Sequence, residues 1–355
     1  IDHCNTHSSF KDKVYMSNLC QEITLPTKPI QHIDDAEGEI ALCILSAVNL
    51  GLIRDKEDLE ELCDLSVRAL DEIIDYQEYP VEAARVSTES RRSLGVGFIG
   101  LAHYLAKNHV KYDDKEALLL VDEVTEAFQY YLLKASNTLA QEKGKCDWFD
   151  KTKYSDGILP IDTYKKDLDK IVKRKLSYDW KQLRKDIQEH GLRHSTLSAQ
   201  MPSESSSVVS NATNGIEPPR DYLSIKKSKK GTLKQIVPDY YRLKNFYTLL
   251  WDMGGNAGYI HIIATMQKYF DQSISGNWSY NPENYADREV PLSVMANDLL
   301  TTYKLGWKTS YYQNTYDAKQ DIDEPVHTIG WRDDVKEEPL LEIVDDQEEC
   351  EACVI

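Results

Sequence analysis

Amphipathic segments of helical length alternate with short apolar runs along this chain. Residues 55–76 and 115–143 carry apolar side chains at the three- and four-residue spacing of a helix, so both are predicted helices. The second helix is expected to bury Leu118, Leu119, Phe128, Tyr131, Leu132, Ala135 and Leu139. Short apolar or β-branched runs at 94–99, 196–201 and 308–312 are predicted strands. Helices interleaved with short buried strands predict an α/β architecture, as a barrel or an open sheet.

The charge of the chain is concentrated near its C-terminal end. The 355 residues carry a formal charge of −17, with 42 Lys and Arg against 59 Asp and Glu. Between Asp317 and Glu351 there are 14 acidic and 3 basic residues, so this segment holds −11 of the total. A stretch this acidic cannot bury enough apolar surface to order itself. The pattern predicts a domain over residues 1–316 and a flexible acidic tail over 317–355, and it argues against nucleic acid as a partner.

Cysteine usage and hydropathy favour a cytoplasmic protein without a membrane partner. Seven cysteines are few for this length and odd in number, which is typical of a reducing compartment. No apolar run approaches the roughly 18 residues of a membrane span, and the N-terminus lacks the features of a secretory signal. Cys63 and Cys146 stand in or just after apolar helical stretches and are interpreted as core residues. Because Ile1 is not a methionine, we expect the chain to be trimmed or only part of something larger.

Three patterns that could indicate ligand sites are better explained structurally. The run Gly95–Gly100 has the dinucleotide-binding spacing, but polar residues 89–93 stand where a buried strand is required, so a tightly packed strand is favoured. The His and Cys side chains of residues 3–7 lack a second ligand pair at the spacing that zinc needs, so no metal site is expected. The basic turn at 226–231 lies between two alternating stretches and is interpreted as a hairpin.

Three other segments leave a chemical role open. In an extended segment, Asn18, Cys20 and Glu22 would share one face, although an ordinary polar strand edge would have the same pattern. In Met201–Asn211 a proline and several serines open a helix after an apolar strand, which suits a bound phosphate but also a plain helix cap. The thiols of Cys350–Cys353 can form and exchange a disulfide on a flexible tail, which favours redox chemistry over metal binding.

Together these segments resemble, in order and spacing, the catalytic large subunit of aerobic class Ia ribonucleotide reductase. The resemblance is carried by Asn18-Leu19-Cys20-x-Glu22, Cys43, Met201-Pro202-Ser203-Glu204, Asn211–Arg220, Tyr311-Tyr312-Gln313-Asn314-Thr315 and the tail cysteine pair. It spans essentially the whole chain but corresponds to the C-terminal part of that subunit alone. The implied fold is the C-terminal half of a ten-stranded α/β barrel, with a finger loop that carries the radical cysteine to the centre.

The resemblance also implies roles for the side chains around this loop. Cys20 matches the cysteine whose thiyl radical removes the 3′-hydrogen of the substrate. Glu22 matches the general base that acts on the 3′-hydroxyl, and Asn18 matches the residue that hydrogen-bonds the ribose hydroxyls. Cys43, which by itself is typical of a buried core position, matches one member of the cysteine pair that reduces the substrate.

Further matches extend the implied mechanism along the chain. Tyr311 and Tyr312 match stacked tyrosines that relay the radical from the small subunit to Cys20, although adjacent residues of a regular strand point in opposite directions. Cys350 and Cys353 match the tail pair that reduces the active-site disulfide and is recharged by thioredoxin or glutaredoxin. The loop matched to the substrate diphosphate consists of Ser203, Glu204, Ser205 and Ser206.

The resemblance implies partners rather than a cofactor on this chain. The radical is expected from a small subunit with a diferric-tyrosyl centre, and nucleotide effectors (ATP or dNTPs) are expected on an N-terminal part outside this sequence. Ribonucleoside diphosphates are the expected substrates, converted to 2′-deoxyribonucleoside diphosphates for DNA synthesis. The second reducing cysteine should also lie outside this sequence, so we expect activity only with a chain that supplies the N-terminal half. A naturally split subunit and a fragment of an intact one both fit.

Two hypotheses of other classes stay open. A non-catalytic remnant would bind the small subunit or the N-terminal half without turnover, although the retained site residues argue against decay. A stand-alone thiol oxidoreductase built on the tail cysteines would lack the strand-to-helix context of thioredoxin-like motifs.

Overall fold

The structure is a computed structural model that describes residues 7–228 and 231–316. All of them belong to the unit Ile1–Tyr316. The predicted acidic tail with Cys350 and Cys353, and most of segment 3–7, lie outside the described residues.

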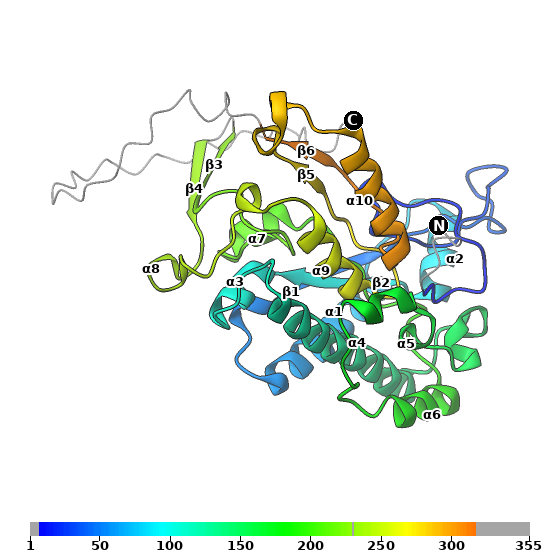
Figure 1. Ribbon diagram of the computed structural model, residues 1–355. Helices are drawn as coiled ribbons and strands as arrows, with labels where there is room; N and C mark the ends of the chain where they lie inside the picture. Colours follow the sequence, from blue (N-terminus) through cyan, green and yellow to red (C-terminus); the bar gives the residue numbers. More distant parts are fainter. Residues whose placement is uncertain (1–6, 229–230, 317–355) are drawn as a thin grey trace, which may run out of the picture. The chain divides into compact units, whose positions relative to one another are not determined.

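The described chain contains both helices and strands, which confirms the mixed α/β content (Figure 1). The helices are α1 (Lys56–Tyr76), α2 (Glu82–Arg91), α3 (Leu101–Lys107), α4 (Lys115–Lys143), α5 (Pro160–Thr163), α6 (Trp180–His190), α7 (Glu204–Val209), α8 (Tyr240–Leu243), α9 (Ala257–Gln267) and α10 (Leu292–Leu305). The strands are β1 (Ile44–Asn49), β2 (Leu94–Ile99), β3 (Leu223–Ser228), β4 (Gly231–Ile236), β5 (Trp278–Tyr280) and β6 (Gln313–Thr315). Both long predicted helices, the strand at 94–99 and the hairpin β3–β4 are confirmed.

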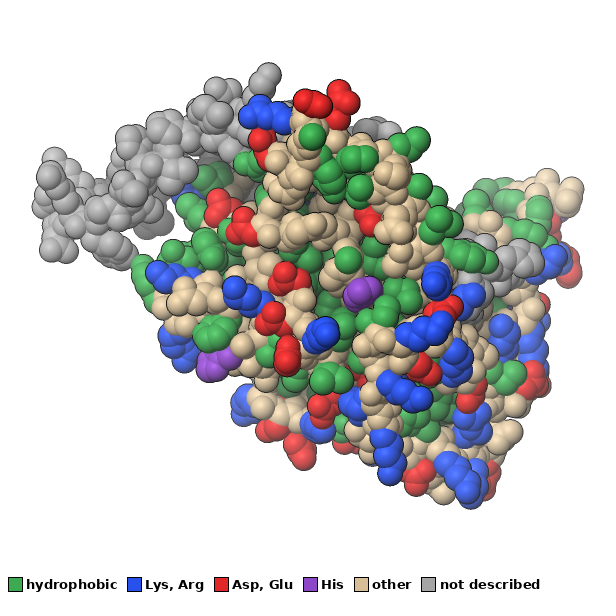
Figure 2. All heavy atoms as spheres, in the orientation of Figure 1, with side chains coloured by type: hydrophobic (Ala, Val, Ile, Leu, Met, Phe, Trp, Pro, Cys, Tyr) green, Lys and Arg blue, Asp and Glu red, His purple; other side chains and the backbone are tan. Residues whose placement is uncertain are grey.

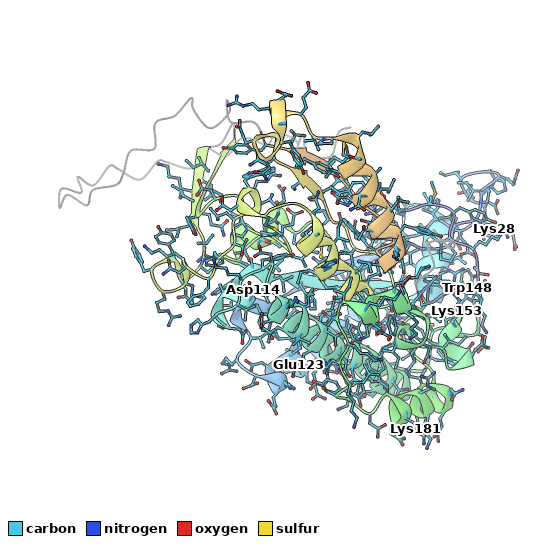
Figure 3. All side chains as sticks on the ribbon, in the orientation of Figure 1. Lys28, Asp114, Glu123, Trp148, Lys153 and Lys181 are labelled. Carbon is cyan, nitrogen blue, oxygen red and sulfur yellow. The ribbon has the colours of Figure 1, made fainter. Side chains whose placement is uncertain are left out.

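The two long helices pack against each other through their predicted apolar faces. The side chain of Asp55 caps α1 by accepting a hydrogen bond from Asp58 N at 2.9 Å, and Cys63 is fully buried against α4, as predicted. At the edge of this contact Lys56 of α1 pairs with Glu123 of α4 at 2.8 Å; Glu123 is labelled in Figure 3. The prediction for Leu119 is wrong, because the core-facing stripe of α4 passes through its neighbour Leu118 and leaves Leu119 48% exposed.

Five extended segments form one parallel row next to these helices. β1 pairs with β2, β2 pairs with 196–201 through Val96 and Ser198, and 196–201 pairs in turn with the segment before β5 through Gln200 and Ile274. β5 then pairs with β6. Within residues 7–228 and 231–316 the row stays open rather than closing into a barrel, and its outer strand β1 has no partner on its other edge.

Two predicted strands are less regular than expected. Segment 196–201 makes only isolated bridges, because the Gln200 side chain takes over the backbone groups of Phe98, accepting from its N at 2.8 Å and donating to its O at 2.9 Å. The prediction of a strand at 308–312 is wrong in position, since the regular strand β6 begins at Gln313. Both irregular segments belong to the surroundings of the candidate site.

The glycine run forms the buried strand β2 rather than a nucleotide-binding turn. A Cβ at Gly95 would lie 2.5 Å from Leu45 Cδ2, and one at Gly97 would lie 2.6 Å from Ala199 O. The Gly97 contact is with backbone and leaves no room for a Cβ, whereas a Cβ at Gly95 would require the Leu45 side chain to move. These glycines therefore permit the close packing of three neighbouring segments.

A buried ionic cluster joins α1, the link between α2 and β2, and residues 193–194. The Asp71 carboxylate accepts hydrogen bonds from Arg92 Nε at 2.6 Å and Arg193 Nε at 3.2 Å, and it lies 3.2 Å from His194 Nε2. Burial lowers the pKa of His194 to about 4. Ser136 lies on the other side of the His194 ring, but Ser136, His194 and Asp71 are all fully buried, so this Ser-His-Asp arrangement is structural.

Acid is expected to destabilise the protein through His194. Its pKa is about 4 when folded against a reference value of 6.5, so the unfolded state binds more protons between these pH values. The free energy of unfolding should therefore decrease as pH falls from 6.5 to 4, by up to about 1.4 kcal/mol per pH unit from this group. Urea denaturation at several pH values measures the slope. The variant His194→Gln should have a shallower slope, and an unchanged slope would contradict the assignment.

The surface is charged over the lower helices and more apolar along α10. Figure 2 shows Lys, Arg, Asp and Glu side chains interspersed over α4, α5 and α6. On α10 the exposed apolar side chains are Leu292, Leu299, Leu300 and Tyr303. Among the described helices, none combines the length and apolarity that a membrane crossing requires.

Candidate active site

Residues 18–23 form a tight turn rather than the predicted extended segment. Asn18 Oδ1 accepts from Ile23 N at 3.0 Å, Asn18 N donates to Ile23 O at 3.3 Å, and Gln21 adopts a left-handed φ of 68°. The prediction of a shared strand face is wrong, because an asparagine side chain that bonds the backbone favours a turn over a strand. Even so, the turn brings the Asn18 and Glu22 side chains into hydrogen-bonding contact.

Glu22 is a buried carboxyl group at the base of this turn. Only 2% of the residue is exposed, and Oε2 has no hydrogen-bond partner among the described residues. Burial raises the pKa of Glu22, and the hydrogen bond from Asn18 partly opposes this rise. A buried carboxyl group with one unpartnered oxygen and a raised pKa binds a proton more readily than an exposed carboxyl group, which suits proton transfer.

Tyr311 and Tyr312 form a stacked pair that reaches the turn. Their ring centroids are 3.7 Å apart at an angle of 31°, and their hydroxyl oxygens are 2.8 Å apart. Hydrogen bonds with the side chains of Tyr312 and Cys20 raise the pKa of Tyr311. The turn and this segment are also joined by Thr309 Oγ1, which donates to Gln21 O at 2.8 Å. Because residues 308–312 are not a regular strand, consecutive tyrosines can stack, and Cys20, Tyr311 and Tyr312 form a continuous chain.

Cys43 immediately precedes β1, on the outer edge of the parallel row. It is half-buried rather than fully buried, because no described strand covers that edge. Its Sγ accepts a hydrogen bond from Gln272 Nε2 at 3.5 Å. Burial raises the pKa of the Cys43 thiol to about 12, and the negative charges of Glu22 and Asp271 add to this effect. Cys43 and Glu22 are therefore electrostatic neighbours, although they are 21 positions apart in sequence.

The serine loop borders a cavity of about 500 Å³ that also contacts the tyrosine pair. Ser203 precedes α7 and is buried, yet its Oγ neither caps the helix nor meets any other described partner. Glu204, Ser205 and Ser206 are exposed, and of these three Glu204 lines the cavity. The remaining walls come from residues 212–221, the β3–β4 hairpin, Ser275, Asn277, Tyr311, Tyr312 and Asn314. The cavity thus lies between the two segments that the resemblance matched to phosphate binding and radical relay.

Sequence reasoning missed two polar residues behind the tyrosine pair. Asn277 Oδ1 accepts from Tyr312 N at 3.0 Å, and Asn277 Nδ2 donates to the carboxylate of Glu217. Burial raises the pKa of Glu217. Glu217 belongs to the segment Asn211–Arg220, so the resemblance pointed to its neighbourhood, whereas no motif marked Asn277.

These contacts define an α/β protein whose polar site combines a thiol, two stacked tyrosines and a buried carboxyl group. The chain belongs to the family described as ribonucleotide reductase, barrel domain, which matches residues 1–245 and 239–313.

Known relatives are similar over almost the whole chain. It is 59% identical over 327 residues to the ribonucleoside-diphosphate reductase subunit alpha of Haemophilus influenzae, covering 91% of this chain and 43% of that protein. It is 57% identical to the ribonucleoside-diphosphate reductase 1 subunit alpha of Escherichia coli K12, and the match covers 90% of this chain and 43% of that protein. Identity to the alpha subunit of Enterobacteria phage T4 is 42%, covering 92% and 44%. The chain therefore spans less than half the length of these relatives.

Proposed function

We propose that this chain supplies the C-terminal part of the catalytic subunit of a ribonucleoside-diphosphate reductase. The complete enzyme converts ribonucleoside diphosphates to 2′-deoxyribonucleoside diphosphates by thiyl-radical chemistry. The observation that carries the proposal is the hydrogen-bonded chain of Cys20, Tyr311 and Tyr312 beside the cavity, in a sequence 57–59% identical to named reductase subunits.

The turn supplies the groups that start the reaction. The Cys20 thiyl radical removes the 3′-hydrogen atom of the ribose, and Glu22 accepts the proton of the 3′-hydroxyl. Asn18 hydrogen-bonds the ribose hydroxyls. The unpartnered Oε2 of Glu22 supports this assignment, because it leaves a buried acceptor for the substrate.

The reduction consumes two thiols and releases water. The 2′-hydroxyl leaves with a proton from the reducing pair, and that pair donates two electrons as its thiols become a disulfide. Cys43 is one member, and the other comes from the remainder of the subunit. Cys20 then returns a hydrogen atom to C3′, so that ribonucleoside diphosphate and two thiols give deoxyribonucleoside diphosphate, water and a disulfide. Cys350 and Cys353 would reduce this disulfide by thiol exchange, with thioredoxin or glutaredoxin as the final reductant.

The cavity is the proposed substrate site. The diphosphate of the substrate would bind beside the loop Ser203–Ser206, of which Glu204 lines the cavity. The buried Ser203 hydroxyl of this loop has no described partner. A buried hydroxyl without a partner is destabilising, so a ligand that accepts its hydrogen bond restores the lost contact.

Two partner chains complete the proposed enzyme. The open edge of β1 would pair with a strand from the rest of the barrel, because an unpaired strand edge and half-exposed apolar residues such as Leu45 require cover. A small subunit with a diferric-tyrosyl centre would deliver the radical to Tyr312, which is 54% exposed. The helix α10, which carries exposed apolar side chains, ends six residues before Tyr311 and is a candidate contact surface for that subunit.

Reconstitution tests this proposal directly. The chain alone should give no deoxyribonucleotide, whereas a mixture with the remaining part of the large subunit and the small subunit should reduce ribonucleoside diphosphates. Product is measured by chromatography, with native mass spectrometry to establish which chains associate. Full reductase activity from the isolated chain would contradict the divided site, and a stable but inactive complex would favour a non-catalytic binding role.

A further inference from the structure

Gln272 contacts two parts of the candidate site at once. Its Nε2 donates to Cys43 Sγ at 3.5 Å and to Leu94 O at 2.8 Å. Its Oε1 accepts from Thr24 N at 3.2 Å, on the segment that follows the Asn18–Glu22 turn. The amide is fully buried, so these three contacts use its hydrogen-bonding groups away from solvent.

The backbone beneath this side chain is held in place by surrounding groups. Gln272 N donates to Ser198 O at 3.0 Å, and Gln272 O accepts from Gln267 Nε2 and Lys308 Nζ, both at 2.8 Å. The next residue, Ser273, donates its N–H to Glu22 O at 3.0 Å. The Glu22 backbone and the Cys43 thiol therefore rest on one rigid segment.

Its neighbour Asp271 is fixed by a second set of contacts. The Asp271 carboxylate accepts from Tyr154 at 2.8 Å and from the backbone N–H groups of Leu197 and Ser198 at 2.9 and 2.8 Å. Because Asp271 and Gln272 are both held by these contacts, their segment does not shift when the Cys43 side chain moves. Gln272 thus holds its donor at a defined place beside the sulfur.

We propose that Gln272 is a positioning residue that holds the Cys43 thiol in register with the turn carrying Cys20 and Glu22. This inference rests on the redox role proposed above for Cys43, and it adds a residue for which the sequence contains no motif. A thiol at the edge of a strand can rotate about its χ1 angle, and a donor on a fixed amide favours one orientation of the sulfur. Gln272 also accepts a hydrogen bond from Thr24 N, next to the turn, so the Cys43 thiol and the turn are fixed relative to the same side chain.

The charge environment makes the Gln272 hydrogen bond measurable. Glu22 and Asp271 are the charged groups that act on Cys43, and both disfavour its thiolate. The Gln272 amide is the group that opposes them, because an N–H donor stabilises the thiolate more than the thiol. Loss of this donor should decrease the thiolate fraction, and one unit of pKa corresponds to about a tenfold change in that fraction.

Peptide-resolved alkylation of Cys43 with iodoacetamide tests the proposal on the chain itself. Gln272→Leu removes the donor, and Gln272→Glu keeps the size but replaces the donor with a carboxyl group. Both variants should alkylate Cys43 about tenfold more slowly than the wild type at a fixed alkaline pH, with the pH profile displaced to higher pH. Rates within twofold of the wild type, faster rates, or a decrease confined to one variant would overturn the proposal.

Gln200→Leu is the matched control. Gln200 is also a fully buried amide, but its side chain bonds only backbone groups, those of Phe98 and Met201. Its removal should leave Cys43 alkylation unchanged, which separates a positioning effect from general loosening of the fold. In the reconstituted enzyme the Gln272 variants should lower kcat with little change in KM. An inactive wild-type complex would refute the proposed function, whereas the alkylation result would still stand.

Discussion

Replacement of Cys20 by serine is expected to abolish ribonucleotide reduction in the reconstituted complex, by on the order of 10³-fold or more. A serine hydroxyl cannot form the radical that a thiol forms, so hydrogen abstraction at C3′ stops. The serine side chain is similar in size and lies on a turn held by hydrogen bonds between the side chain and backbone of Asn18 and the Ile23 backbone, so folding should be unaffected. Deoxyribonucleotide formation and complex mass are the measurements.

Cys146→Ser provides the matched control for thiol loss. Cys146 is buried, as predicted from its place after the helix now seen as α4, and none of its contacts reach the turn. This variant should retain turnover even if its stability decreases. If Cys20→Ser instead retained turnover, the thiyl mechanism would be wrong for this chain. A wild-type complex that assembles without turnover, unaffected by the substitution, would favour the non-catalytic remnant.

Replacement of Tyr311 by phenylalanine is the second change expected to eliminate turnover. Phenylalanine keeps the ring that stacks on Tyr312 at 3.7 Å but removes the hydroxyl that bonds both Tyr312 and Cys20. Oxidation of a tyrosine releases an electron and the hydroxyl proton, and phenylalanine has no such proton to release. We therefore expect less than about one-thousandth of wild-type activity, with an unchanged melting temperature.

Tyr76→Phe is the control for loss of a tyrosine hydroxyl. Tyr76 is the last residue of α1 and is 91% exposed, so its substitution should change neither activity nor stability. Radical transfer is followed by the loss of the small-subunit radical signal during turnover, and product is measured in parallel. If Tyr311→Phe reduced ribonucleotides at the wild-type rate, the proposed relay role of Tyr311 would be wrong, whereas the proposed role of Cys20 would be unaffected.

The helices were predictable because their periodicity spans many residues. The apolar stripes of α1 and α4 repeat over five turns or more, so single exceptions such as Leu119 do not obscure them. The shorter extended segments were predicted less well. In 196–201 a side chain of Gln200 replaces backbone pairing, and in 308–312 the irregular segment that stacks the tyrosines precedes β6. The local preference of these residues for strand does not reveal the Gln200 side-chain contacts or the irregular backbone of 308–312.

The candidate site was predictable where residues stand together in a motif. Asn18, Cys20 and Glu22 are close in sequence, although their local conformation was predicted as a strand and is a turn. Gln272 was not predictable, because its contacts with Cys43 and Thr24 join positions 229 and 248 residues apart. Such contacts arise from the packing of distant segments and leave no signal in a single sequence.

The consecutive positions of Tyr311 and Tyr312 have a consequence for motion. The two tyrosines are joined by one peptide bond, so the covalent chain limits how far apart their rings can move. Cys20, by contrast, lies on a turn almost three hundred positions away in sequence and reaches Tyr311 through a side-chain hydrogen bond and the Thr309 contact. A relative movement of the turn and segment 309–312 would thus lengthen the Cys20–Tyr311 distance and leave the stacked rings together. Within this chain, conformational control of the proposed radical transfer would therefore act at the contact between Cys20 and Tyr311.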